Sequence, residues 1–220
     1  MLEAFSRRLG HSFKDVSLLE ASLIHRSYTA ERPHVPDNER MEFLGDAVLQ
    51  LAVTEFLYAH FPDLREGEMA KVRAACVSGS QLADVAAELG LGSLVKMGVG
   101  EAASGGRKKR SILADAMEAV LAAVYLDAGF SVAREVVLAH WTPIIRAKAL
   151  EPGRRDYKTR YQEVLAAEGK RPEYQVEGSG PDHDRHFVAT LTVDGVVMGT
   201  GEGKSKKEAQ QAAARDALGD

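Results

Sequence analysis

The sequence predicts an α+β fold, in which an all-α domain is followed by a small domain of α-β-β-β-α order. Over roughly the first 150 residues, apolar side chains recur at the three- and four-residue spacing of helices. After the segment EPGRR they alternate as they do in strands. The length of 220 residues also exceeds the ~100–150 residues of a typical domain. We therefore expect domains at 3–150 (core 3–128) and 156–220, joined by a linker at 151–155.

Three helices stand out in the N-terminal part. The clearest covers about 38–60 and ends before Pro62. A second covers about 111–129, because it opens on a serine, a good N-cap residue, and closes on a glycine. A third covers roughly 132–150, where Pro143 predicts a kink or a break because proline lacks a backbone N–H.

The C-terminal part predicts a different order of elements. A helix is expected first, then three strands with alternating apolar residues, then a second helix. The expected ranges are 157–168, 172–178, 186–193, 196–203 and 205–218.

Composition argues against a membrane or a disulfide-bonded protein. Hydrophobic residues make up 45% and charged residues 27%, which is ordinary for a globular chain. We find no stretch near the ~18 apolar residues of a membrane span and no apolar run typical of a secretory signal. Cys76 is the only cysteine, so an internal disulfide and a thiolate metal cluster are excluded, and we expect it in the core. We expect a cytoplasmic location and no membrane partner.

The net charge of −4 provides no general basic excess for binding nucleic acid. Contacts with nucleic acid must then depend on where cations cluster. The densest basic run begins at Arg107, continues through Lys108 and Lys109, and ends just before the second helix. A flexible loop there could steer a phosphate backbone. A plain solvated loop is the alternative.

Carboxylates gather on two otherwise apolar helices. Glu39, Glu42 and Asp46 are three and four residues apart, which places them on one helix face. Asp115 and Glu118 repeat the three-residue spacing. Because unpaired buried carboxylates are costly and oxygen ligands suit Mg²⁺ or Mn²⁺, the pattern predicts a divalent metal site between the two helices. Solvated acidic stripes are the alternative.

Other catalytic arrangements fit less well. A ferritin-like di-iron site needs Glu-x-x-His motifs on its helices, and the one candidate, Glu31 to His34, contains Pro33. No serine or cysteine has a convincing histidine partner, and His25 is typical of a hydrogen-bonded structural histidine.

Three segments resemble the ribonuclease III family. NERMEFLGDAVL at 38–49 is similar to the family signature, with Met41 in place of the more usual leucine, a volume-conserving change. LIHRSY at 23–28 and SILADAMEA at 111–119 are similar to two further blocks. The resemblance extends over essentially the whole chain in the expected order.

This resemblance implies roles for the acidic residues. Asp46 and Glu118 match the positions usually called active-site residues. Glu42, Asp115 and Glu118 match direct metal ligands, and Asp46 completes the set of metal-site carboxylates. Mg²⁺ is the expected ion, with Mn²⁺ as a possible substitute. One metal can lower the pKa of a bound water, and a second ~4 Å away can stabilise the leaving oxygen.

The resemblance also implies roles for three neighbouring residues. Glu39 and Glu66 match acidic positions that assist near the cleft, although a glutamate such as Glu66 also suits a helix start. Phe43 matches a position that packs across a homodimer interface. Ordinary core packing within one subunit is the alternative for Phe43.

Residues 156–220 resemble the double-stranded-RNA-binding domain, through YKT at 157–159, GPDH at 180–183 and GEGKSKKEA at 201–209. Such domains contact two successive minor grooves across ~16 bp. By this resemblance, Gln162 and His183 reach 2′-hydroxyls or base edges.

The last helix is expected to bind phosphates at its start. Lys204, Lys206 and Lys207 would hold them where free N–H groups and the helix dipole also favour anions. A P-loop is rejected because Met198 stands where that motif needs glycine, and we expect no nucleotide cofactor.

Together the resemblances imply a homodimeric endoribonuclease that hydrolyses double-stranded RNA. Its products would carry 5′-phosphate and 3′-hydroxyl ends with short 3′ overhangs, and its substrates would include rRNA precursors and other structured transcripts. A non-catalytic double-stranded-RNA binder is the main alternative, and the presence of all four carboxylates argues against it. The C-terminal domain argues against a hydrolase of small phosphate esters.

Overall fold

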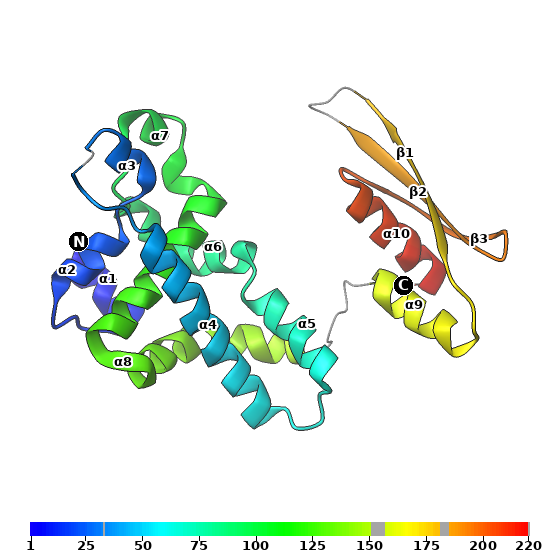
Figure 1. Ribbon diagram of the computed structural model, residues 1–220, viewed down its shortest axis with the longest axis horizontal. Coiled ribbons are helices and arrows are strands. Elements are labelled where there is room, and N and C mark those ends of the chain that lie inside the picture. The colour runs from blue at the N-terminus through cyan, green and yellow to red at the C-terminus, as the bar shows by residue number, and fades with distance from the viewer. Residues whose placement is uncertain (33, 151–156, 181–184, 220) are drawn as a thin grey trace. The chain divides into compact units, whose positions relative to one another are not determined.

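The computed structural model describes residues 1–32, 34–150, 157–180 and 185–219. The chain divides into two compact units, Met1–Pro152 and Gly153–Asp220, which we describe separately (Figure 1). The linker expected at 151–155 lies outside the described residues.

The first unit is helical, as the sequence predicts. In chain order its elements are α1 (Leu2–Leu9), α2 (Val16–Ser22), α3 (Arg26–Ala30), α4 (Glu39–His60), α5 (Glu66–Cys76), α6 (Gly79–Glu88), the 3-10 turn η1 (Leu91–Ser93), α7 (Val99–Ala103), the 3-10 turn η2 (Gly106–Lys108) and α8 (Arg110–Ala149). The helix predicted at 38–60 is confirmed as α4, with Asn38 at its N-cap. Helix α8 packs against α2, α4, α5 and α6 and so forms the centre of the unit.

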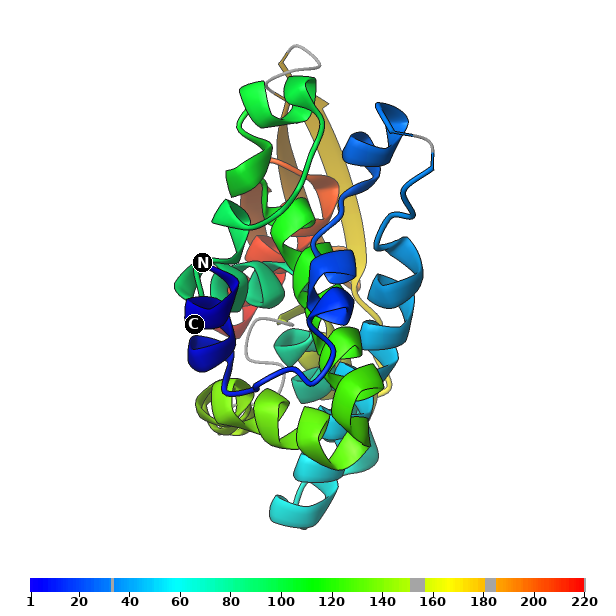
Figure 2. The same cartoon turned by 90° about the vertical axis from the view of Figure 1, so that its left-hand side faces the viewer.

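Helix α8 consists of two helical segments that run in different directions (Figures 1 and 2). They join at Gly129, whose φ of 80° and ψ of 176° suit glycine, so the helix end predicted there is confirmed. Of the kink or break predicted at Pro143, a break is wrong, because Pro143 lies inside the second segment, which keeps helical dihedral angles. Trp141 and Ile145 on either side are fully buried, and their packing outweighs the lost backbone hydrogen bond.

By length and composition alone, α8 could cross a membrane, contrary to the expectation from the sequence. Half of its most apolar 18-residue window is buried inside the unit. This burial against neighbouring helices is typical of the core helix of a globular domain.

The core also joins α5 to the second segment of α8. The indole N–H of Trp141 donates a hydrogen bond to the carbonyl oxygen of Cys76 at 3.0 Å. Cys76 is fully buried, as the sequence predicts, and burial raises the pKa of its thiol to about 11. The thiol is therefore a packing group.

The second unit has the predicted α-β-β-β-α order, so the α+β fold is confirmed. Its elements are α9 (Tyr157–Ala167), β1 (Glu173–Ser179), β2 (His186–Val193), β3 (Val196–Gly203) and α10 (Lys206–Leu218). The strands form an antiparallel sheet in the order β1-β2-β3, and both helices lie on one face of it (Figure 1). Ala189 and Leu191 face the helices and are fully buried.

Two glycines let α10 lie close to β3. A Cβ added to Gly201 would be 2.1 Å from the backbone nitrogen of Ala213, and one added to Gly199 would be 2.4 Å from the carbonyl oxygen of Ala213. The carboxylate of Asp216 then accepts a hydrogen bond from the backbone N–H of Thr200 at 2.9 Å. The C-terminal half of α10 is thereby fixed against β3.

Candidate metal centre and nucleic-acid interface

The acidic site depends on a close crossing of α4 and α8. Gly45 of α4 lies against the backbone of Glu118 of α8, so a Cβ added to Gly45 would be 1.8 Å from the Glu118 carbonyl oxygen. Only glycine permits this approach. Acidic side chains lie beside the crossing on both helices, because Glu42 and Asp46 flank Gly45 and Asp115 precedes Glu118 by about one turn.

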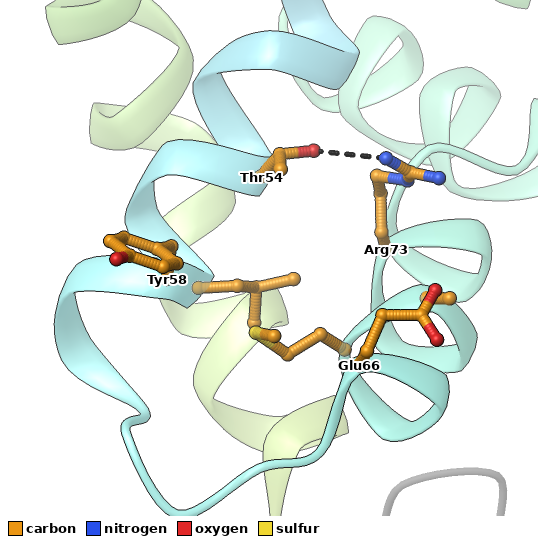
Figure 3. A pocket seen from close by; sticks show the side chains of 7 residues that line it. Thr54, Tyr58, Glu66 and Arg73 are labelled. Atoms are coloured by element: carbon orange, nitrogen blue, oxygen red, sulfur yellow. Dashed lines mark hydrogen bonds between the residues drawn. The ribbon is translucent and has the colours of Figure 1, made fainter.

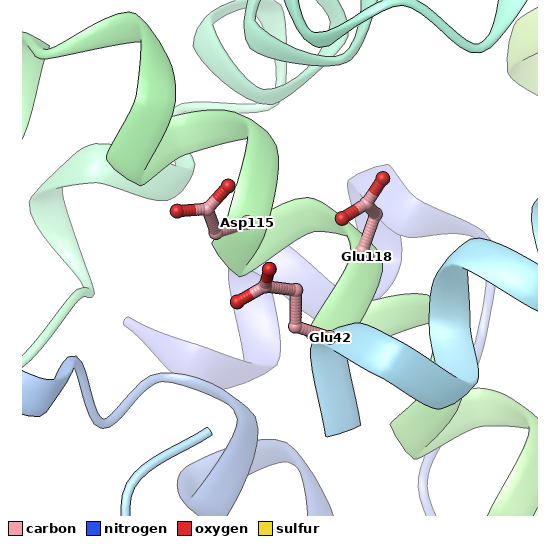
Figure 4. A group of neighbouring side chains, drawn as sticks. All are labelled: Glu42, Asp115 and Glu118. Atoms are coloured by element: carbon pink, nitrogen blue, oxygen red, sulfur yellow. The ribbon is translucent and has the colours of Figure 1, made fainter. Parts of the chain in front are cut away.

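Three carboxylates converge at this crossing. Glu42 from α4 and Asp115 and Glu118 from α8 each offer an oxygen, and these oxygens lie within 4.8 Å of one another (Figure 4). All three residues are half-buried. The structure thus brings together the three residues that the family resemblance matches to direct metal ligands.

The electrostatics of the cluster favour a cation. Burial first, and then the charges of Asp46, Glu42 and Asp115, together raise the pKa of Glu118 to about 8. Burial and neighbouring carboxylates also raise the pKa of Glu42, and burial raises that of Asp115. Without a cation, the site therefore keeps a proton near neutral pH.

Asp46 lies at the edge of this group. Its two carboxylate oxygens accept hydrogen bonds from the side-chain amide of Gln50, at 2.9 and 2.8 Å, and Asp46 is not among the three converging residues. Its charge is nevertheless the first neighbouring charge that raises the pKa of Glu118. Asp46 is thus held next to the cluster by Gln50.

The donor set fits a hard divalent cation. Its ligands are carboxylate oxygens, which suit Mg²⁺ and Mn²⁺. Among the described residues, no lysine or arginine forms a hydrogen bond or an ion pair with Glu42, Asp115 or Glu118, so no fixed cation replaces a metal there.

A cleft of about 650 Å³ opens beside the cluster, lined by Glu42 and Asp115 and by residues of α3, α7 and the start of α8. Two cations line it, Arg26 and Lys109, and each faces a carboxylate at the rim. The Arg26 guanidinium lies 3.6 Å from Glu39, so Glu39 is at the cleft but outside the three-residue cluster.

His25 also lines the cleft, with a structural hydrogen bond. Its Nδ1 accepts a hydrogen bond from the backbone N–H of Ser27 at 3.2 Å and so caps α3. Burial lowers the pKa of His25. This is the hydrogen-bonded role that the sequence favours.

Glu66 lies elsewhere on the chain. It begins α5 and lines a separate pocket of about 130 Å³ between α4 and α5, together with Tyr58, Met69 and Arg73 (Figure 3). The Arg73 guanidinium donates to the hydroxyl of Thr54 at 3.3 Å in this pocket (Figure 3). Within one chain, Glu66 therefore does not join the acidic cluster.

Phe43 projects into solvent. Its side chain is 83% exposed although it is beside Glu42 on α4, so the alternative of core packing within one subunit is wrong. Leu51 and Tyr58, which follow on the same helix, are also exposed.

The basic run before α8 is not the flexible loop that the sequence suggests. It forms η2, and the Arg107 guanidinium donates to the carbonyl oxygens of Gly92, Ser93 and Val95. These three bonds use one guanidinium nitrogen of Arg107 to hold the chain after η1. Arg107 is nevertheless exposed, so its contact with nucleic acid stays a prediction. Lys108 is exposed and remains a candidate, whereas Lys109 lines the cleft.

The start of α10 presents the predicted lysines to solvent. Lys204, Lys206 and Lys207 are exposed. The Ser205 hydroxyl accepts a hydrogen bond from the backbone N–H of Glu208 at 3.2 Å, and the Glu208 carboxylate accepts one from the backbone N–H of Lys204 at 2.8 Å. These two hydrogen bonds fix the backbone that carries the lysines at the helix N-terminus.

Two further RNA contacts were predicted in the second unit, Gln162 and His183. Gln162 is exposed on α9. His183 lies outside the described residues.

Sequence reasoning missed Gln50, Glu101 and the role of Gly45. The role of Gly45 could have been predicted, since a glycine inside an apolar helix costs stability unless a neighbour approaches closely. Gln50 and Glu101 act through contacts that spacing along one helix does not specify.

Comparisons with known proteins match both units. A family profile described as Ribonuclease-III-like matches residues 15–144, and one described as Double-stranded RNA binding motif matches residues 157–219. A helical unit with an acidic cleft, followed by this motif, defines a nuclease with its own RNA-binding domain.

Relatives place the chain within one family. Ribonuclease 3 of Thermobifida fusca is 55% identical over 203 residues, which cover 91% of this chain and 84% of that protein. Ribonuclease 3 of Streptomyces coelicolor is 50% identical over 96% of this chain and 76% of that protein. The chain belongs to the ribonuclease III family of double-stranded-RNA endonucleases.

A solved structure is similar in fold to the first unit. The nuclease domain of ribonuclease III from Campylobacter jejuni superposes with a TM-score of 0.62 at 40% identity, and the match covers 65% of this chain and 97% of that domain. That structure is described as flexible in a region involved in dimer formation.

Proposed function

We propose that this chain hydrolyses phosphodiester bonds of double-stranded RNA at the α4–α8 crossing, with Mg²⁺ held by Glu42, Asp115 and Glu118. The convergence of these three carboxylates within 4.8 Å carries the proposal. Mn²⁺ has the same preference for oxygen ligands and is the expected substitute.

When bound, a divalent cation lowers the pKa of a coordinated water and neutralises charge that builds up on the phosphate. The protein residues prepare this site. Glu118 would be deprotonated in the metal-bound site, because a cation offsets the burial and the neighbouring charges that raise its pKa. Asp46, oriented by the Gln50 amide, would add a carboxylate beside the three ligands.

The second unit supplies affinity for duplex RNA. Lys204, Lys206 and Lys207 are positioned to hold phosphates at the start of α10, and Gln162 on α9 to contact a minor groove. The family resemblance assigns His183 to the same surface. On the nuclease unit, the exposed candidates are Arg107, Lys108 and Lys109.

We propose that the enzyme is a homodimer formed through α4. Phe43, Leu51 and Tyr58 share one face of this helix and are 83%, 54% and 78% exposed. A two-fold axis at Leu51 pairs α4 antiparallel with its copy and places Phe43 opposite the region of the partner subunit's Tyr58. The apolar pocket beside Tyr58 is the site that we assign to the phenyl ring.

This arrangement gives Glu66 a role. Glu66 lines the same pocket, so Phe43 of one subunit brings its neighbour Glu42 next to the partner's Glu66. Each acidic site would then be completed by an acid from the other subunit, together with Glu39 of its own. Two sites related by a two-fold axis suit the two strands of a duplex.

The expected products carry 5′-phosphate and 3′-hydroxyl ends with short 3′ overhangs. The expected substrates are rRNA precursors and other structured transcripts in the cytoplasm. The supporting observations are the family membership and the separate RNA-binding unit.

The test is incubation of long duplex RNA with the protein, with and without Mg²⁺, followed by sizing on a gel. Single-stranded RNA and duplex DNA are the controls. Short duplex fragments that form only with Mg²⁺ support the proposal. Tight binding of duplex RNA without cleavage would establish the alternative, a non-catalytic binder.

A further inference from the structure

The wall of the cleft contributed by α7 and η2 holds a cation in a fixed place. The Lys109 ammonium donates a hydrogen bond to Glu101 Oε1 at 2.6 Å, and both residues line the cleft together with Glu42 and Asp115. The hydroxyl of Ser104 lies 3.4 Å from the Lys109 ammonium and 3.4 Å from Glu101 Oε1. The Lys109 ammonium is therefore held at the cleft by a hydrogen-bond network with Glu101 and Ser104.

The backbone around Glu101 is built to keep its side chain there. A Cβ added to Gly106 would lie 2.7 Å from the Glu101 carbonyl oxygen and 2.8 Å from its Cγ and Oε1. The turn that leads into α8 thus packs directly on the Glu101 side chain. The hydrogen bond from Lys109 also lowers the pKa of Glu101, so the Glu101 carboxylate is ionised at neutral pH.

Lys109 differs from the other cations of the basic run. Arg107 is committed to backbone carbonyls, and Arg110 pairs with Asp84 at 2.8 Å and donates to the Ser80 carbonyl. Lys109 alone of the run 107–110 lines the cleft. It is also the N-cap residue of α8, so its backbone is fixed relative to Asp115 on the same helix.

The distance along α8 determines which phosphate of a bound RNA strand Lys109 can reach. Six residues separate Lys109 from Asp115, a rise of about 9 Å. An ammonium at that position can bind a phosphate that neighbours the phosphate bound at the carboxylate cluster. It remains 48% exposed, so a phosphate oxygen can approach it without displacing the protein backbone.

We propose that Lys109 binds the phosphate adjacent to the scissile phosphate, and that Glu101 is the positioning residue that aims Lys109 at it. This rests on the proposed function, because it assumes that the scissile phosphate binds at the carboxylate cluster. Lys109 holds the strand in register with the metal site. Glu101 touches no substrate and acts by restricting the Lys109 side chain to one orientation.

Substitutions of Glu101 and Lys109 should change the rate of RNA cleavage differently from the affinity for duplex RNA. Glu101→Gln removes a negative charge from an RNA-binding cleft, so duplex binding should stay equal or tighten. The cleavage rate of bound RNA should still fall, by roughly 3- to 10-fold, because misplacing a substrate-holding group lowers the rate. Lys109→Gln should lower that rate more, by roughly 10- to 100-fold. Lys109→Arg, which keeps the charge, should restore part of it.

The experiment is a double-mutant cycle on the full chain. Single-turnover cleavage with Mg²⁺ and duplex binding in EDTA are measured for wild type, Glu101→Gln, Lys109→Gln and the double variant, with thermal unfolding to confirm folding. Because Glu101 acts through Lys109, the double variant should cleave no more slowly than Lys109→Gln. Glu3→Gln and Arg7→Gln, in an exposed ion pair of α1 at 3.0 Å, are matched controls expected to cleave normally.

The outcomes are distinct. If wild type does not cleave with Mg²⁺, the proposed function itself fails. If wild type cleaves and Glu101→Gln and Glu101→Ala both cleave at the wild-type rate or faster, Glu101 is not a positioning residue. Independent, multiplicative losses in the double variant would overturn its action through Lys109.

Discussion

The acidic crossing of α4 and α8 and the lysine-bearing start of α10 are built in opposite ways. The first brings like charges together from helices far apart in sequence, at half-buried positions where burial raises the pKa values of all three carboxylates. Repulsion between the carboxylates adds to the rise for Glu42 and Glu118. The second displays like charges along one helix end in solvent, where local capping hydrogen bonds fix the backbone. The first arrangement demands a cation and one geometry, whereas the second provides graded, salt-sensitive attraction. A single substitution at the crossing should therefore abolish cleavage. A single substitution at α10 should lower RNA affinity by only a small factor.

The largest expected effect is at Glu118. Glu118→Ala should abolish cleavage at physiological Mg²⁺ and leave duplex binding nearly intact, because it removes a metal ligand without touching the second unit. Cleavage and binding are measured on the same duplex. Glu135→Ala, an exposed acid on the same helix, is the matched control and should cleave normally. Near-normal cleavage by Glu118→Ala would refute the assignment of the site.

The crossing itself can be broken without removing an acid. Gly45→Ala places a methyl group where the Glu118 backbone lies, so the helices must separate. We expect destabilisation of about 3 kcal/mol, measured by urea unfolding, and a cleavage rate lower by roughly 100-fold. Gly79→Ala is the control, since its added Cβ would meet Ala114 at an ordinary 3.9 Å. Equal behaviour of the two variants would contradict the close crossing.

In the proposed homodimer, one of the two acidic clusters can be inactivated while the other stays intact. A heterodimer of one intact subunit and one Glu118→Ala subunit, purified with two different tags, should nick duplex RNA without severing it. This follows if each acidic cluster cuts one strand. Native and denaturing gels of the products distinguish nicks from double-strand cuts. Efficient double-strand cleavage, or an active monomer, would overturn the one-cluster-per-strand arrangement.

Repulsion at the crossing also predicts a pH dependence of stability. Since the folded pKa of Glu118, about 8, lies above the ordinary value of 4.5, the folded state binds a proton that the unfolded state releases. Without metal, the free energy of unfolding should therefore fall as pH rises from about 4.5 to 8. We expect a fall on the order of 1–2 kcal/mol, because water screens a half-exposed group.

Urea unfolding between pH 5 and 8.5 measures this fall. Glu118→Gln, which cannot ionise, should show a smaller one, and saturating Mg²⁺ should remove most of it. A pH dependence that is the same in wild type and Glu118→Gln would show that Glu118 is not the group responsible.

The smallest effect is expected at α10. Lys206→Ala and Lys207→Ala should each weaken binding of any duplex sequence by a few-fold. Each should also reduce the slope of log affinity against log salt by roughly one unit. Lys14→Ala, on an exposed loop of the first unit, serves as control. An unchanged slope would show that the α10 lysines do not contact phosphates.

The two regions also differ in how far the sequence predicts them. The strands and α10 follow from local alternation and capping, so they are predicted to within a residue or two. The acids of α4 and α8 are predicted by spacing, but their meeting depends on Gly45, a tertiary contact.

Other misses have the same origin. Pro143 stays helical because distant residues bury its neighbours. The basic run forms a 3-10 turn, and Arg107 donates to carbonyls of a segment more than ten residues earlier. Periodicity along one element does not encode such contacts.

The most direct test of the central claim is calorimetric titration of Mn²⁺ into the RNA-free protein at pH 7, in two buffers of different ionisation enthalpy. If Glu42, Asp115 and Glu118 hold the ion, binding should saturate and release about one proton per site, because Glu118 with a pKa of about 8 must deprotonate. Glu118→Gln should bind much more weakly and release no such proton. Equal binding by wild type and Glu118→Gln, or binding without proton release, would contradict the claim that these carboxylates form the metal centre.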